Sequence, residues 1–398
     1  MNPVFAVIAV ASFVSGANLR LFDVLLPTIA EAFDSPVTTA AVVVTAFTLG
    51  YGLFQLVLGP LGDRIGKTRV IAASSFIAGT ASLGSAFIDS LSALTALRFV
   101  TGIGAGGIIP LALAWIGDNT PYEKRQATLG GFLGIVLLGH ILGPAVGGAL
   151  AHLVTWRAVF LLFALLFFAS SMALLVQDVR ARKLATPSFR KIGFLRGYAE
   201  VLRDRWVRTV LLTVSIEGAL FYGAFTYTGA YLKDRFGLSY LAIGAVIAAF
   251  GFGGVLYSLS VRWLLRRLGE TGLVTGGAFL LLGCYVLLPL LPVWQPVVVL
   301  LIVAGIAFYM FHNTLQTRST EMAPKSRGVA LALHACCMFL GQAAGVALCG
   351  IAIRVLNYEW TFVLCGAGLA LLGRWFSQRI VRHRQAREPA PVDPAPNR

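Results

Sequence analysis

The sequence predicts an all-α membrane protein with twelve transmembrane helices in two pseudo-symmetric halves of six. Hydrophobic residues make up 58% of the 398 residues and charged residues only 12%, whereas a soluble globular protein carries roughly 25% charged residues. The chain also repeats one pattern at an interval of roughly 200 residues. Pro121 of the first copy corresponds to Pro324 of the second, and Gly139 corresponds to Gly341. Composition and repeat together predict a duplicated six-helix unit.

Twelve apolar stretches approach or exceed the length that a membrane-spanning helix needs, about 20 residues. Backbone polar groups in lipid must be satisfied within each span, so each stretch is predicted to be a helix. The first stretch is too long for a signal-peptide core and has no small-residue cleavage site, so it is predicted to be retained. In order, the spans cover residues 4–30, 38–60, 70–88, 91–115, 127–150, 156–176, 209–232, 239–261, 271–291, 296–317, 328–352 and 357–376.

These spans predict four parts of the chain. They are a six-helix bundle over residues 1–177, a basic cytoplasmic linker over 178–208, a second six-helix bundle over 209–377 and a disordered cytoplasmic tail over 378–398. Within the linker, Tyr198–Arg203 is expected to form a short amphipathic helix on the inner surface. The tail is rich in proline, a composition typical of disorder.

The basic residues are divided unequally between the two sides of the membrane. Of the 32 Lys and Arg residues, 26 fall in the even-numbered connections and the tail, so both termini are predicted to be cytoplasmic. A bacterial-type inner (plasma) membrane is expected. The net charge of +15 then reflects orientation and contact with anionic lipid, not nucleic acid. The five cysteines lie in apolar stretches without metal-ligand spacing, so no metal or cofactor is expected.

Four motifs of the first half carry a family resemblance. The loop after span two contains Gly59, Gly62, Asp63, Arg64, Gly66 and Lys67; span four contains Arg98; span five contains Gly139, Gly143, Pro144, Gly147 and Gly148; and span one ends in Leu25–Ala30. These motifs resemble those of the major facilitator superfamily, and in particular its twelve-span drug:proton antiporter branch. Lys67 stands where the family has arginine, and Gly62 where it usually has alanine.

The resemblance implies a conformational switch in the first loop. It implies a relay that joins Asp63, Lys67 and the acid that ends span four, Asp118, and that locks the outward-facing state against span eleven until the halves rock. An ordinary capped cytoplasmic loop is the alternative, and lysine lacks the bidentate contacts of arginine. The corresponding loop of the second half, Arg262–Glu270, lacks the aspartate. The proton machinery is therefore predicted to lie in the first half.

Four charged side chains fall inside the predicted spans, where each is costly unless it is paired or hydrated. Arg20 and Asp23 are three residues apart on one helical face, and Arg98 lies at a similar depth, so the three are predicted to form a proton-coupling cluster. A static salt-bridge cluster that fixes helix packing is the alternative. Glu217, near the midplane, is a second candidate for a proton site or an anchor for a cationic substrate; its alternative is a neutral acid hydrogen-bonded in packing.

Polar and aromatic side chains within the spans are candidates for a substrate cavity. His140 ranks first among the histidines because it lies inside the span-five motif, although a lone histidine is more often a packing residue. Aromatic residues on helices are likewise usually packing or lipid-facing residues. The other candidates are Asn18, Tyr51, Gln55, Phe221, Tyr222, Phe225, His312, Asn313, His334 and Gln342.

Secondary transporters often place their substrate site at the interface of such repeats. The sequence therefore predicts a proton-coupled antiporter that exports a small amphipathic compound, drug-like or metabolite, by alternating access and as a monomer. An uptake symporter or uniporter on the same fold is one alternative. A membrane sensor or assembly partner is a weaker one, because it would not need charges at matching depths. An intramembrane enzyme is disfavoured because the catalytic motifs it would need do not occur.

Overall fold

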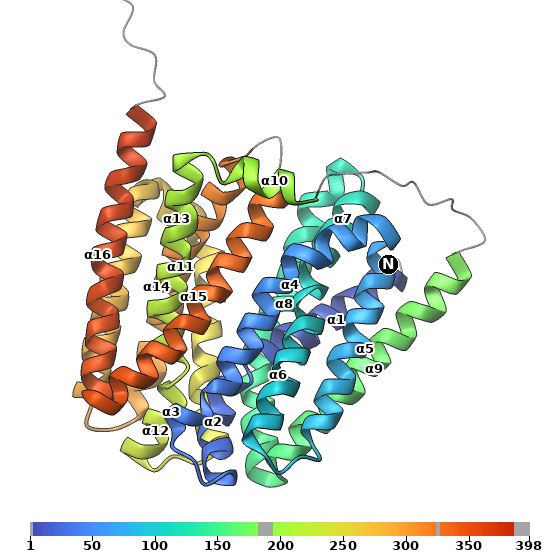
Figure 1. Ribbon diagram of the computed structural model, residues 1–398. Coiled ribbons are helices and arrows are strands. Elements are labelled where there is room, and N and C mark those ends of the chain that lie inside the picture. The colour runs from blue at the N-terminus through green and yellow to red at the C-terminus, as the bar shows by residue number, and fades with distance from the viewer. Residues whose placement is uncertain (1–2, 182–193, 324–326, 386–398) are drawn as a thin grey trace, which may run out of the picture.

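The computed structural model describes residues 3–181, 194–323 and 327–385, and every regular element among them is a helix. The first half consists of α1 (Pro3–Arg20), α2 (Phe22–Ala32), α3 (Val37–Ala40), α4 (Val42–Ile65), α5 (Lys67–Ser85), α6 (Leu91–Gly106), α7 (Ile108–Asn119), α8 (Tyr122–Leu153) and α9 (Trp156–Ala181). Figure 1 shows most of these helices running side by side along one direction.

The second half follows the linker helix α10 (Phe194–Val201). It consists of α11 (Arg205–Phe225), α12 (Thr228–Phe236), α13 (Tyr240–Leu287), the 3₁₀ turn η1 (Leu288–Leu290), α14 (Gln295–Glu321), α15 (Arg327–Val355) and α16 (Tyr358–Gln385). We call the end of the bundle that carries α10 the linker end, and the end that carries α2, α3 and α12 the far end (Figure 1).

The helices agree with the twelve predicted spans. In the described part of the chain, ten helical segments are long and apolar enough to cross a membrane. α5 is not among them, since serines such as Ser74, Ser75 and Ser82 lie along it, and these side chains are buried within the bundle. α13 counts once although its backbone leaves the helical region at Gly269, with φ of 64°. Adding α5 and dividing α13 at Gly269 gives twelve, so the predicted fold class is confirmed.

The first predicted span is two helices rather than one. α1 ends at Arg20 and α2 begins at Phe22, with Leu21 between them. Pro27 has no N–H to donate to the carbonyl of Asp23 four residues earlier. That carbonyl instead faces Gly229 of α12, where even a Cβ atom would overlap it. The break therefore sets Arg20 and Asp23 at a point where the second half approaches the first.

The two halves meet closely at the far end. α8 packs against α13 and α4 against α15, while α2 contacts α12. A Cβ added at Gly244 of α13 would lie 2.6 Å from the carbonyl oxygen of Pro144 on α8. Glu31 of the first half also accepts a hydrogen bond from the Tyr240 hydroxyl of the second half. These contacts close the space between the halves at this end.

The linker end is more open around α8. A hollow of ≈ 640 Å³ lies there, between α1, α7 and α8, and its walls include Trp115, Lys124 and Ile135. The linker helix α10 crosses nearby, where the Tyr198 hydroxyl donates a hydrogen bond to the carbonyl of Leu56 on α4. The amphipathic helix predicted over Tyr198–Arg203 is thus displaced toward the N-terminus, to Phe194–Val201.

The predicted disordered tail begins too early. α16 continues beyond residue 377 to Gln385, because side chains of its last turns have partners: Ile380 is buried, the His383 ring stacks on Trp206, and Arg384 bonds to Glu270. Residues 386–398, like 182–193 of the predicted linker, lie outside the described residues.

Candidate functional site

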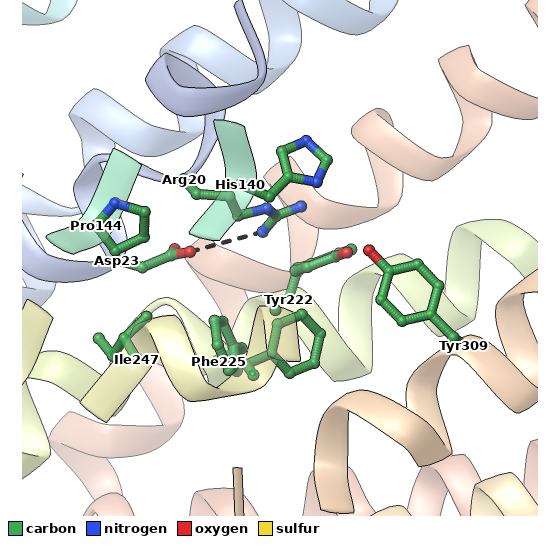
Figure 2. Close-up of a pocket in the computed structure, with 10 residues that line it drawn as sticks. Arg20, Asp23, His140, Pro144, Tyr222, Phe225, Ile247 and Tyr309 are labelled. Atoms are coloured by element: carbon green, nitrogen blue, oxygen red, sulfur yellow. Dashed lines mark ion pairs between the residues drawn. The ribbon is translucent and has the colours of Figure 1, made fainter. Parts of the chain in front are cut away.

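A small pocket lies where the two halves meet (Figure 2). It leaves ≈ 10 Å³ for the centre of a water molecule, about the space that one water needs. The first half contributes Arg20, Asp23, His140 and Pro144, and the second half contributes Tyr222, Phe225, Ile247, Phe250, Gly251 and Tyr309. The charged groups thus come from one half and the aromatic rings from the other.

The ion pair in this pocket is loose. Arg20 Nη1 lies 3.7 Å from Asp23 Oδ2, beyond the length of a hydrogen bond. Both side chains are buried, and neither of these two atoms has a hydrogen-bond partner among the described residues. The guanidinium also lies over the Tyr222 ring, with Cζ 3.8 Å from the ring centroid. Arg20 therefore contacts both halves, while Asp23 keeps an acceptor free.

His140 adds a third unsatisfied atom to the pocket. It reaches the pocket from α8 (Figure 2), and its Nε2 is buried without a hydrogen-bond partner in the described part of the chain. Buried polar atoms are nearly always satisfied by protein or water. Three such atoms around one pocket are the feature expected of a site that binds a polar ligand or water.

The glycines of the span-five motif let α8 approach both of its neighbours. A Cβ at Gly139 or Gly143 would overlap carbonyl groups of α1, and one at Gly148 would overlap the Tyr240 carbonyl of α13. A Cβ at Gly147 would meet only the flexible Leu21 side chain. This motif therefore positions His140 and Pro144 against the second half, by close backbone packing.

Arg98 does not join Arg20 and Asp23, which corrects the predicted cluster of three. Its Nη1 donates a hydrogen bond to Asn18 Oδ1 at 3.0 Å, and its guanidinium lies 4.3 Å and 4.1 Å from the ring centroids of Phe22 and Phe47. Within residues 3–181 the ion-pair partner of Asp23 is Arg20 and not Arg98. An amide oxygen and two ring faces replace the carboxylate that we expected as its partner.

Glu217 has a partner that the sequence analysis did not assign. His312 Nδ1 of α14 lies 2.9 Å from Glu217 Oε2 of α11. Glu217 is fully buried and its Oε1 has no partner in the described residues. His334 of α15 lies beside His312, with ring centroids 5.5 Å apart, and its Nδ1 is 2.7 Å from the Ser319 hydroxyl. The second half thus has a titratable cluster of its own, around the Glu217 that the sequence had singled out.

The first-loop relay has the predicted members. Lys67 Nζ lies 2.8 Å from Asp63 Oδ1 and 2.7 Å from Asp118 Oδ2. Burial lowers the pKa of Lys67, but the hydrogen bonds and charges of Asp118 and Asp63 outweigh it and raise that pKa above 10.5. Gly66 allows the turn with φ of 103°, while a Cβ at Gly62 would overlap Leu111 and Gly59 has open space around it. Arg64 is exposed.

The relay lies within one half, joining α4, α5 and α7. It is intact in this structure, in which the far end is closed, and the conformational switch stays a prediction. The second half has a counterpart that the sequence analysis missed: Glu270 forms an ion pair with Arg318 of α14 and another with Arg384 of α16. Glu270 follows the turn glycine Gly269 as Lys67 follows Gly66, so the central residue of the second network is acidic where that of the first is basic.

Several predicted cavity residues lie away from the pocket. Tyr51 of α4 packs on Phe339 of α15, and Phe221 is buried among aromatic rings of the second half. Gln55 and Gln342 are buried, while Asn313 is half-buried on α14 beside His312. The pocket residues that sequence reasoning missed, Ile247, Phe250, Gly251 and Tyr309, lie in apolar runs of α13 and α14 that carry no distinguishing signal.

Comparisons with known proteins agree with this architecture. The family model described as Major Facilitator Superfamily matches residues 8–326. The uncharacterized MFS-type transporter YceJ of Bacillus subtilis (strain 168) is 26% identical over 351 residues, which are 85% of this chain and 86% of YceJ. The 4-hydroxybenzoate transporter PcaK of Pseudomonas aeruginosa is 24% identical over 69% of this chain and 68% of its own length. The solved structure of a bacterial homolog of the human lysosomal transporter Spinster, inward-facing and occupied, superposes with a TM-score of 0.78 at 17% identity over 98% of both chains.

Proposed function

Because the chain belongs to the Major Facilitator Superfamily, we propose that it is a proton-coupled antiporter that exports a small amphipathic compound across the inner membrane. The membership itself makes it a multi-pass membrane transporter and not an enzyme, in agreement with the sequence. One observation carries the finer proposal: the loose Arg20–Asp23 pair lies in a pocket built by both halves.

Asp23 is the proposed site at which proton and cargo compete. With the far end closed, a cargo reaches the pocket from the linker end, which the basic residues predict to be cytoplasmic. Its apolar body packs on Tyr222, Phe225 and Phe250, and a donor group satisfies Asp23 Oδ2. When the far end opens, a proton from outside binds Asp23 and removes the acceptor, so the cargo leaves. Competition for one carboxylate gives exchange.

Uptake of an organic anion is a second candidate, favoured by Arg20. A proton on Asp23 would free Arg20 to bind a carboxylate, and Arg20 Nη1 already has no hydrogen-bond partner among the described residues. Proton and anion would then bind together rather than compete, which gives symport. PcaK, a relative named as a 4-hydroxybenzoate transporter, adds support for this kind of cargo.

Two probes with the same aromatic body and opposite charges distinguish the candidates. Purified protein in liposomes is given a pH gradient and either tyramine or 4-hydroxybenzoate, with protein-free vesicles as the control for passive movement. Export by exchange predicts that tyramine accumulates in an acidic lumen above the control. Accumulation of 4-hydroxybenzoate in an alkaline lumen would replace antiport by symport. The proposal would be rejected if both probes were transported at rates that depend neither on the pH gradient nor on Asp23→Asn. It would also be rejected if neither probe were transported above the control.

A further inference from the structure

We propose that Glu217, His312 and His334 form a second proton-binding site, contained within the second half and separate from Asp23. The inference deepens the proposed function and rests on it, because it assigns a second proton to each transport cycle. These three residues come from α11, α14 and α15, all of which pack together. The site needs no contribution from the first half.

Glu217 and His312 are the proton-holding pair. His312 Nδ1 and Glu217 Oε2 are 2.9 Å apart, so a proton between them belongs to the pair rather than to either group. In the described part of the chain, no Lys or Arg lies within ion-pair distance of Glu217. The other titratable groups near the pair are Tyr222 on its own helix, Tyr309 of α14 and His334 of α15. Histidine is therefore the only basic partner of this carboxylate there.

His334 is held in one tautomer. The Ser319 hydroxyl donates a hydrogen bond to the Leu315 carbonyl at 3.0 Å, so its oxygen is left to accept from His334 Nδ1–H at 2.7 Å. The lone pair of His334 is then on Nε2, which is buried without a partner among the described residues. An unsatisfied basic nitrogen next to the His312 ring is a ready acceptor for the proton of the pair.

The pair has a partly exposed member, His312, and a contact with the pocket. The His312 side chain is 12% exposed while that of Glu217 is 0% exposed, so a proton enters and leaves through His312. Phe308 stacks on the His312 ring with centroids 5.0 Å apart and contacts the Tyr222 ring edge-on at 5.1 Å. Tyr222 in turn carries the Arg20 guanidinium over its face. A cargo that displaces Tyr222 therefore disturbs the second proton site through two ring contacts.

Stoichiometry tests the proposal in the transport assay with tyramine and 4-hydroxybenzoate. When the membrane potential is clamped to zero, the concentration ratio of the probe across the membrane equals the proton concentration ratio raised to the number of coupled protons. One pH unit then predicts about 100-fold accumulation for two protons and about 10-fold for one. The wild type is expected to give the first value and Glu217→Gln or His312→Gln the second. An unchanged exponent in both variants, with gradient-driven flux intact, would overturn the site while leaving the proposed function standing.

Histidine NMR tests the same site without any cargo. In the full chain in nanodiscs with ring-¹⁵N histidine, His334 is expected as the Nδ1–H tautomer, and Ser319→Ala is expected to abolish that preference. Glu217→Gln is expected to shift the His312 ring signals and to leave those of exposed His152 unchanged. A wild-type His334 in the Nε2–H form, or His312 signals indifferent to Glu217→Gln, would refute the assignment. This readout decides the site even if neither probe is transported.

Discussion

The close contact between α8 and α13 predicts that one added methyl group will open the far end. A Cβ at Gly244 would lie 2.6 Å from Pro144 O, 3.3 Å from Gly148 Cα and 3.4 Å from Ala145 Cα. The obstructing atoms belong to the backbone of α8, so the two helices must move apart. Overpacking of this kind costs about 1–3 kcal/mol. A conformation with the far end open separates these helices and avoids the cost, so a difference of about 2 kcal/mol shifts the equilibrium toward it by about 30-fold.

Spin-label distances across the far end measure this shift. Val154, at the end of α8, and Leu290, in η1, are 67% and 70% exposed, and single cysteines there report the separation of the halves once the five native cysteines are replaced by alanine. Gly244→Ala is expected to raise the population at long distance. Gly277→Ala is the matched control, since its Cβ would lie 2.6 Å from Ala307 O within the second half. That variant is expected to lower the thermal unfolding temperature without changing the distances.

Gly244→Ala would refute this prediction if it gave the same distance distribution as the wild type and only lost stability, as the control does. The contact would then belong to every conformation of the molecule, and α8 and α13 would not separate during transport. A shift toward shorter distances would be equally damaging, because it would mean that the methyl group tightens the contact.

Three further predictions follow from individual side chains. Asp23→Asn is expected to abolish gradient-driven flux of tyramine and to weaken tyramine binding, because the neutral amide resembles the protonated acid that releases the cargo, while the unfolding temperature stays that of the wild type; loss of flux together with unfolding would favour the static salt-bridge alternative. Lys67→Met is expected to lower the free energy of unfolding by about 1 kcal/mol, measured by denaturant unfolding, because the Asp63 and Asp118 carboxylates are 62% and 60% exposed and water weakens such ion pairs. Because the pKa of Lys67 is raised in the folded state, its contribution to the free energy of unfolding is present below pH 10.5 and is lost as the pH rises through the folded pKa. The free energies of unfolding of the variant and the wild type should therefore converge in alkaline solution. Arg98→Lys is expected to lower the unfolding temperature, because lysine cannot stack its charge between two rings as the planar guanidinium does; an unchanged temperature would show that those ring contacts contribute little.

The fold could be predicted because each span has to satisfy a length and a composition that lipid imposes. Interruptions were less predictable. The segment around Leu21 contains neither glycine nor proline, and Pro27 acts from one turn beyond the break by leaving the Asp23 carbonyl free. The two helices of α13 were predicted with a gap at residues 262–270, and the change of backbone direction at Gly269 lies within it.

The sequence predicted how deep in the membrane each site residue lies, but not which neighbouring helix its side chain faces. Arg98 and Asp23 share a depth, yet Arg98 is bound to Asn18, because position along a helix does not fix which neighbour a side chain faces. Glu217 was correctly singled out as a buried charge, but its partner His312 lies on α14, and only packing brings the two together. Phe250 and Tyr309 reach the pocket from helices whose sequence is uniformly apolar, so no contrast in residue type marked them.

Arg20 connects the protonation of Asp23 to the arrangement of the two halves. Its ion pair with Asp23 lies within the first half, whereas its contact with the Tyr222 ring joins the first half to the second. With Asp23 ionised, the guanidinium is drawn toward the carboxylate; with Asp23 protonated, that attraction ends and the ring face is the remaining partner for the charge. The two protonation states therefore differ in how strongly Arg20 joins the halves, and a ligand can shift a conformational equilibrium only through such a difference. In the proposed cycle, a proton on Asp23 would therefore act on the contact between the halves as well as on the cargo.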